Sequence, residues 1–370
     1  MTTPLYSAST PLASESDTDT PKWTRVQIQF GLLIAGLMLA VLGGLMFGAA
    51  AIPARAVLSS LWSAFPGVSS NAHTAADHLI IWQLRLPRVL LAGCIGAGLA
   101  VAGAAIQAVF RNPLADPGLI GVSSGSALAA ITMIVLGDLI LVGALAQFQL
   151  VALPIAAFIG GLITTALIYR ISTMAGITRI HTLLLAGIAI GALTGAISGV
   201  LTYLADDVQL RSLTFWSMGS LGGATWPTLF SVLPWILLAL FVIPYFSNAL
   251  NAILLGENVA QHLGMNAQRI KKGVIALAAL AVGASVAAAG MIGFVGLVIP
   301  HLMRLWLGPD HRILLPACAL SGAMLLIGAD LIARTIAAPA EIPIGIITAL
   351  LGSPFFLWLL LNQGRQSRLH

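Results

Sequence analysis

Arg211 is one of the few side chains in this sequence that could bind a charged ligand. The chain has only 17 basic and 12 acidic residues among 370, so an isolated charge beside an apolar segment draws notice. Arg211 follows Asp206 and Asp207 just past the end of a long apolar block. A guanidinium binds a carboxylate through two parallel hydrogen bonds, which would suit an acidic substrate. A local ion pair with Asp206 or Asp207 is the alternative interpretation.

Three other arginines lie at the ends of apolar blocks. Arg85 and Arg88 open the second block, and Arg334 closes the ninth. Arginine at such a position commonly extends its charge to the membrane surface while its stem stays in the apolar layer. Asp330 precedes Arg334 by four residues, a spacing that permits an ion pair along a helix. An acid inside an apolar block is also a candidate for coupling to an ion.

The remaining polar residues form no catalytic or metal-binding pattern. The seven histidines are scattered without metal-ligand spacing, and Cys94 and Cys318 both lie inside apolar segments. Ser123, Ser124 and Ser126 stand near an expected helix start, where serine caps or packs. The sequence also has no phosphate-binding GxxxxGK[ST] loop. We therefore expect no enzymatic activity, no metal and no permanently bound cofactor.

One polar stretch, Gly256–Lys272, interrupts the apolar sequence. We expect two short amphipathic helices here, the first ended by Gly264 and the second, Ala267–Lys272, capped by Asn266. Such a pair is typical of a surface that contacts another protein, and an ordinary solvated connector is the alternative. The residues that we assign to this contact are Gly256, Glu257, Asn258, Gln261, His262, Leu263 and Gly264.

Composition indicates an all-α polytopic membrane protein. The chain is 59% hydrophobic and only 8% charged, whereas soluble domains carry about 25% charged residues. Its small net charge of +5 is spread along the chain and does not form a nucleic-acid patch. The sequence contains ten apolar blocks long enough to cross or enter a bilayer. They are Phe30–Ala51, Leu86–Phe110, Gly118–Leu136, Leu150–Tyr169, Thr182–Leu204, Leu229–Phe246, Val274–Ala289, Phe294–Leu307, Ile313–Ala333 and Ile344–Leu361.

The basic residues predict the orientation. With both termini in the cytoplasm, twelve of the 17 lysines and arginines fall on the cytoplasmic side, as the positive-inside rule requires. We expect residues 1–27 to be a disordered cytoplasmic tail, 28–362 the transmembrane domain, and 363–370 a cytoplasmic tail. Three Gly- or Pro-rich breaks interrupt the spans, at 112–117, 290–296 and 342–343. Irregular backbone at that depth must be buried in protein or line a cavity.

A series of motifs follows one another along the chain: Leu84–Arg88, Gly103–Gln107, Arg111–Gly118, Gly121–Gly125, Phe215–Ser220, Leu255–Glu257, Gly293–His301, Asp310–Arg312 and Glu341–Gly345. In this order they resemble the FecCD-type permeases of ABC importers for iron-siderophores, vitamin B12 and heme. The resemblance covers residues 28–362. It implies the type II ABC importer permease architecture, with ten transmembrane helices in each subunit of a homodimer in the inner membrane.

The resemblance also implies partners. Two ATP-binding subunits, which hold ATP and Mg, would sit on the cytoplasmic surface 256–272. A periplasmic substrate-binding protein would dock on Arg85, Arg88 and Arg334 through acidic residues. The substrate would pass along the dimer interface.

The segment 203–216 is most similar to the heme importers of this family, through its Asp-Asp, Gln-Leu-Arg and Phe-Trp elements. We therefore expect heme as the transported substrate, with Arg211, Phe215 and Trp216 at the mouth of its pathway. Ferric siderophore or vitamin B12 carried by the same architecture is the alternative. A secondary transporter driven by an ion gradient is a remoter one, for which Asp330 is the candidate coupling acid.

Overall fold

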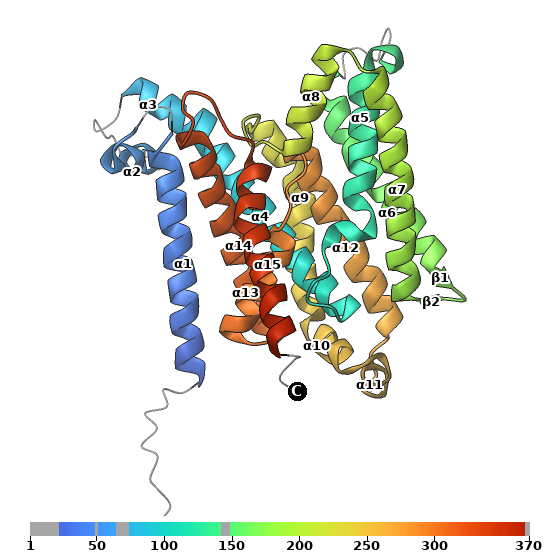
Figure 1. Ribbon diagram of the computed structural model, residues 1–370. Helices are drawn as coiled ribbons and strands as arrows, with labels where there is room; N and C mark the ends of the chain where they lie inside the picture. The colour runs from blue at the N-terminus through green and yellow to red at the C-terminus, as the bar shows by residue number, and fades with distance from the viewer. Residues whose placement is uncertain (1–21, 49–50, 64–73, 142–148, 367–370) are drawn as a thin grey trace, which may run out of the picture.

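The apolar blocks fold into long helices that run between the two ends of a bundle (Figure 1). The computed structural model describes residues 22–48, 51–63, 74–141 and 149–366. The helices of the first half are α1 (Lys22–Met46), α2 (Ala54–Trp62), α3 (Ala75–Leu79), η1 (Ile80–Arg85), α4 (Leu86–Phe110), η2 (Pro117–Ile120), α5 (Val122–Ile140), α6 (Gln149–Ser172) and α7 (Ile180–Leu204). Those of the second half are α8 (Asp207–Met218), α9 (Trp226–Val242), η4 (Ile243–Phe246), α10 (Ser247–Leu255), α11 (Glu257–His262), α12 (Ala267–Ala289), α13 (Val295–Leu307), α14 (His311–Thr335) and α15 (Ile344–Gln366).

The two ends of the bundle carry different short elements. Helices α2, α3 and α8 lie at one end, which we call the α8 end (upper in Figure 1). Helices α10 and α11 lie at the other, the α11 end, together with the start of α1 and the last turns of α15. A two-stranded hairpin, β1 (Thr173–Met174) and β2 (Ile177–Thr178), joins α6 to α7 with Thr173 opposite Thr178. The described chain therefore starts and finishes at the same end, as an even number of crossings requires.

The prediction of ten spans is confirmed. Within the described residues, eight helices are long and apolar enough to cross a membrane, and two shorter apolar segments, Val295–Leu307 of α13 and Ile344–Leu359 of α15, account for the other two blocks. Helix α13 has 13 residues, in keeping with the short block expected at 294–307. Such a length fits a helix that is embedded among its neighbours and does not cross the bilayer alone.

Helix α4 is the centre of the bundle, and glycines let its neighbours approach it closely. It packs on α9, α12, α13 and α14. A Cβ added at Gly96 would collide with the Gly322 carbonyl of α14, and one at Gly103 with the Gly296 carbonyl of α13. Such close contacts at small residues are typical of helix packing in membrane proteins.

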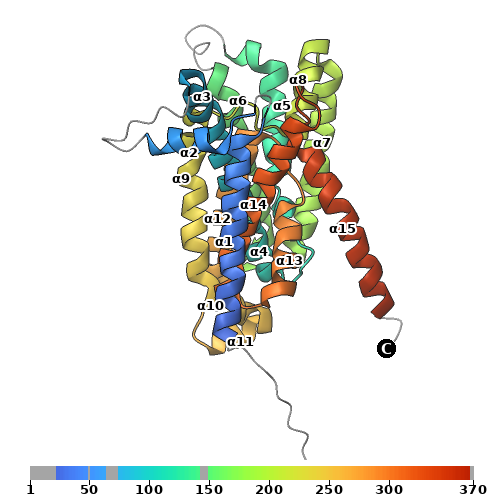
Figure 2. The ribbon, with the colours of Figure 1, turned by 90° about the vertical axis from the view of Figure 1, so that its left-hand side faces the viewer.

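Two helices on the periphery are covered far less. Figure 1 shows α1 on one side of the bundle, where it packs against α14, and Figure 2 shows α15 diverging from the bundle toward its C-terminal end. Helix α7 exposes a glycine face: a Cβ added at Gly191, Gly195 or Gly199 would meet no atom within 4 Å. The protomer thus leaves a smooth helical face without a neighbour in the described structure.

The structure differs from the sequence-based expectations at several boundaries. Helix α1 starts at Lys22, inside the range assigned to the disordered tail, and α15 extends to Gln366. The remainder of both predicted tails, 1–21 and 367–370, lies outside the described residues. The expectation of two short helices after Gly256 was half wrong. Helix α11 is short, but Ala267–Lys272 forms the first turns of the span α12, because Asn266 caps a helix that has no break before Gly290.

Candidate functional site

The three arginines assigned to docking come together at the α8 end, where Arg88 and Arg334 pair with Asp330 and Arg85 lines the same pocket as both. Arg88 pairs with two carboxylates: its Nη2 lies 2.8 Å from Asp330 Oδ1, and its Nη1 lies 2.8 Å from Glu341 Oε1. Arg334 Nε lies 3.5 Å from Asp330 Oδ2, which confirms the predicted pair along α14. Asp330 is 2% exposed and Arg88 12%, whereas Glu341 is 41% exposed. Glu341 is thus the member of this cluster that faces out.

Arg85 and Arg334 also hold the C-terminal end of α1. Arg85 Nη1 donates to the carbonyls of Leu45 and Met46 at 2.6 and 2.8 Å, and Arg334 Nη2 donates to the carbonyl of Gly44. The last carbonyls of a helix have no partner within it and carry partial negative charge, so cations are favoured there. Both arginines are therefore buried, a position that the sequence did not indicate.

A pocket of about 360 Å3 opens beside this cluster. Arg85, Arg88, Arg334 and Glu341 all line it, together with the glycines Gly48 and Gly222. The hydrogen bonds from Arg88 lower the pKa of the Glu341 carboxyl below its ordinary value, although partial burial acts in the opposite direction. The pocket is consequently a positively lined socket, closed on one side by an ionised carboxylate, that could accept a carboxylate from a second protein.

Helix α8 carries the three residues assigned to the substrate pathway. Its start is fixed by a capping box, in which the Asp206 side chain accepts from the Gln209 backbone at 2.8 Å. Arg211 is exposed and forms no ion pair with any described residue, so the local pairing with Asp206 or Asp207 is not formed. Phe215 is exposed, and Trp216 packs partly against the core. An exposed guanidinium and an exposed ring thus lie one turn apart on α8.

The irregular breaks meet at a second pocket that the motif analysis did not assign. It has a volume of about 450 Å3. Its described lining residues are Asp116, Ser123, Ser217, Met218, Met291, Ile292, Gly293, Phe294, Gly345, Ile346 and Ala349. The breaks at 112–117, 290–296 and 342–343 each contribute to it or adjoin it, which confirms that this irregular backbone borders a cavity. The two methionines gave no sequence signal, because they are 73 positions apart and meet only through the fold.

Of the seven residues assigned to the ATPase contact, five on α11 and the turn after it are exposed, whereas Gly256 and Glu257 are half-buried. Asn258, Gln261, His262, Leu263 and Gly264 are exposed. Glu257 instead turns inward: its Oε1 lies 2.6 Å from Lys271 Nζ, and its Oε2 accepts from Gln268 Nε2 at 3.2 Å.

Lys271 and Gln268 join α11 to the β-hairpin. The Lys271 amine also donates to the Thr178 carbonyl at 3.3 Å, and the Thr178 amide donates to Gln268 Oε1 at 2.9 Å. Lys271 is only 1% exposed. The sequence counts it among the cytoplasmic basic residues but does not indicate its burial at the centre of this group. We call Glu257, Gln268, Lys271 and Thr178 the lysine clasp.

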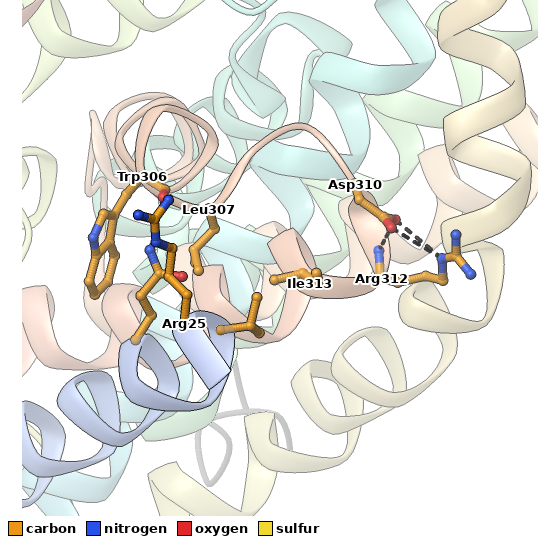
Figure 3. A pocket seen from close by; sticks show the side chains of 8 residues that line it. Arg25, Trp306, Leu307, Asp310, Arg312 and Ile313 are labelled. Carbon is orange, nitrogen blue, oxygen red and sulfur yellow. Dashed lines mark hydrogen bonds and ion pairs between the residues drawn. The ribbon is translucent and has the colours of Figure 1, made fainter. Parts of the chain in front are cut away.

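A further pocket of about 680 Å3 lies at the α11 end, between α1 and the α13–α14 turn (Figure 3). Gln29 of α1 donates to the Trp306 carbonyl at 3.1 Å, and Asp310 pairs with Arg312 at 3.3 Å. Hydrogen bonds from Arg312 and Asn251 lower the pKa of Asp310, against the opposing effect of burial. The described lining comes from α1, α13, α14 and their turn, away from α8 and α15. We do not assign this pocket to the substrate pathway.

Comparison with known proteins places the chain in a family. A model of the FecCD transport family matches residues 34–362. The hemin transport system permease protein HmuU of Yersinia pestis is 46% identical over 352 residues, which cover 92% of this chain and 98% of that protein. The vitamin B12 import system permease protein BtuC of Escherichia coli is 43% identical over 296 residues, or 79% and 86% of the two chains. A solved metal-chelate-type ABC transporter in an inward-facing conformation superposes with a TM-score of 0.78 at 34% identity, over 91% of this chain and 99% of that one. The chain therefore belongs to the FecCD transport family.

Proposed function

We propose that this protein is the permease subunit of an ATP-driven importer that moves heme into the cytoplasm. The observation that supports heme as the substrate is the 46% identity to a hemin permease, which extends over 98% of that protein. Heme has an apolar macrocycle and two carboxylates, and the exposed Arg211 and Phe215 on α8 offer a guanidinium and an apolar ring side by side. Scattered histidines favour passage over stable ligation of the iron.

In this proposal the α11 end faces the cytoplasm and the α8 end faces the periplasm. Arg25, Arg170, Arg179, Arg269 and Lys272 then lie toward the cytoplasm, in keeping with the positive-inside rule. Both termini of the chain are cytoplasmic, and the protein resides in the bacterial inner membrane.

The substrate passes between two copies of this chain. The uncovered glycine face of α7 supports a homodimer, because a smooth helix surface can pack closely on a partner or leave space beside it. The pocket formed by Met218, Met291, Phe294 and Gly345 opens on the side of α8 and α15 and would lie along this route. Arg211, Phe215 and Trp216 stand at its periplasmic mouth.

Two partner proteins complete the machine. A pair of ATPase subunits, which hold ATP and Mg, contacts the exposed residues of α11, and the lysine clasp keeps that helix in place. A periplasmic binding protein docks over the arginine pocket and sets its acidic side chains against the positive lining. The burial of Arg85 and Arg334 means that these two act mainly by fixing the shape and charge of the socket.

Substrate-stimulated ATP hydrolysis tests the proposal. The chain is co-expressed with its ATPase, reconstituted in nanodiscs and assayed with its binding protein loaded with heme, vitamin B12 or a ferric siderophore. Heme should give the greatest stimulation and should also be the substrate that accumulates in proteoliposomes. Equal or greater stimulation by another substrate would replace heme, and failure to co-purify any ATPase would reject the importer itself.

Vitamin B12 is the second candidate substrate, favoured by the 43% identity to an import permease for it. An ion-coupled transporter has weaker support, because Asp330 is committed to two arginines and is 2% exposed. An acid held in two ion pairs cannot exchange a proton without uncovering buried charge.

A further inference from the structure

We propose that Glu341 occupies the arginine socket as an internal substitute for the binding protein's carboxylate, and that docking exchanges one for the other. This inference rests on the docking step of the proposed function and adds a competitor that belongs to the chain itself.

The geometry of the Arg88–Glu341 pair is that of a ligand in a receptor site. Both terminal nitrogens of Arg88 donate to Glu341, to Oε1 at 2.8 Å and to Oε2 at 2.9 Å. This bidentate arrangement is the one in which guanidinium groups recognise free carboxylates. Arg88 is 12% exposed, so an incoming acid must reach the same two nitrogens through the opening in which Glu341 now lies.

Glu341 is held less firmly than the other members of the cluster. It lies on the connection 336–343 between α14 and α15, whereas Asp330 and Arg334 are on α14 itself. Its carboxylate is 41% exposed, so it can return to water without a large desolvation change. The Gly222 backbone is close to it: a Cβ there would lie 3.2 Å from Glu341 Oε2. The absence of a side chain at Gly222 leaves room for the carboxylate to move.

Exchange would leave the buried charges paired. Arg88 keeps its contacts with Asp330, where Nε donates to Oδ1 at 2.9 Å, whether or not Glu341 is present. One carboxylate leaves the guanidinium and another arrives, so the pairing of Arg88 is conserved. An exchange of this kind gives specificity for an acidic partner but only modest net affinity, which suits a partner that must dissociate in each cycle.

Release of Glu341 would also affect the pocket of about 450 Å3 beside α8 and α15. Two residues separate it from Ile344, whose amide donates to the Gly219 carbonyl at 3.0 Å. Gly345 follows, packed on the carbonyls of Met218 and Met291, and it lines that same pocket of about 450 Å3. The connection therefore joins the docking socket to the first turn of α15 and to the pocket through which the substrate would pass.

Binding measurements on the reconstituted complex test the exchange. The parent and Glu341→Gln complexes are compared in nanodiscs for association with the immobilised binding protein at low salt. Removal of the competing charge should tighten binding by roughly three- to tenfold, mostly through the association rate. Glu341→Asp keeps the charge but shortens the reach to Arg88, and it should tighten binding by a smaller factor.

Asp138→Asn is the matched control. Asp138 is exposed near the end of α5, whose Val135 carbonyl accepts from Gln209 of α8, so it lies at the same end of the bundle. The Asp138→Asn substitution removes one negative charge at that end without altering the arginine pocket. The affinity of this variant for the binding protein should equal that of the parent. Unchanged or weaker binding by a folded Glu341→Gln complex would overturn the exchange, as would equal tightening by Asp138→Asn. A parent complex that binds no periplasmic partner at any salt concentration would overturn the docking step as well.

Discussion

Breaking the lysine clasp from either side should give unequal losses of stability. Lys271 is 1% exposed and Glu257 31%, so the two partners are not equally able to return to water when the other is removed. Glu257→Gln leaves a buried ammonium without a counter-charge. Lys271→Met leaves a carboxylate that is partly solvated and still accepts a hydrogen bond from Gln268. The asymmetry of burial therefore predicts the order of the two effects.

The magnitudes follow from the contacts that each change removes. Loss of one partner from a buried ion pair costs about 3–5 kcal/mol, which applies to Glu257→Gln. Lys271→Met uncovers the Thr178 carbonyl and removes one charged hydrogen bond from a carboxylate that water can reach, for about 1–3 kcal/mol. The double variant has neither buried charge, so it should be more stable than Glu257→Gln alone.

Unfolding midpoints of the purified complex in a single detergent would give this ranking. Lys272→Met serves as the control, because Lys272 is the adjacent lysine and is exposed. We expect Glu257→Gln to be the least stable, Lys271→Met and the double variant to be intermediate, and Lys272→Met to match the parent. Losses that simply add in the double variant would refute the reasoning, as would Lys271→Met being the worse single change. In the intermediate variants, ATP hydrolysis should continue with less transport per ATP, since α11 is held to the hairpin by fewer contacts.

Three further outcomes are expected. Arg211→Ala should lower heme uptake into proteoliposomes and leave basal ATPase activity unchanged. Arg211→Lys should restore only part of the uptake, because lysine keeps the charge but lacks the paired N–H donors of the guanidinium. Unaltered uptake by the alanine variant would exclude a substrate contact. The stability difference between the parent and Glu341→Gln should be constant from neutral pH to about pH 5 and should shrink as the pH falls below about 4.3. The reason is that a carboxyl whose pKa is lowered in the folded state stabilises the fold only while it is ionised. Unfolding midpoints measured across this pH range test the prediction. Gly103→Ala, whose Cβ would collide with the Gly296 carbonyl, should lower the folded yield strongly. Gly195→Ala, whose Cβ would meet no atom within 4 Å in the described part of the protomer, should fold normally and alter only dimer assembly as seen by size-exclusion chromatography. Equal yields would contradict this account of the packing.

The succession of apolar helices could be predicted from the sequence because hydropathy is a local property. Each is a continuous apolar run that its length and composition identify. The same holds for the caps: Gly264 ends α11 with a positive φ of 78°, and Asn266 accepts from the Arg269 amide at 3.0 Å, both as expected. These signals involve residues within four positions of one another.

The functions of single charges could not be predicted in the same way. Lys271 was counted among the cytoplasmic basic residues with no partner assigned, and its amine contacts Thr178, which precedes it by 93 residues. Arg85 reaches carbonyls 39 and 40 positions earlier, on α1. In each case the charge is used by a helix end or a hairpin whose proximity arises from the packing of the bundle, and no periodicity or motif in the sequence encodes it.

Arg85, Arg88 and Arg334 each make contacts that stabilise the fold, so substitutions at these arginines cannot isolate a docking contact. Arg85 and Arg334 bind the last carbonyls of α1, so replacing either one would release that helix along with any docking contact. Replacing Arg88 would leave the buried Asp330 with a single, longer ion pair. Reversed charges at these arginines would therefore weaken association even if no partner touched them. Glu341 is the position in the cluster where a charge can be altered without uncovering a buried group, because its carboxylate already faces water. A tighter complex in Glu341→Gln could not result from damage to the fold, and this makes the gain of affinity the informative result.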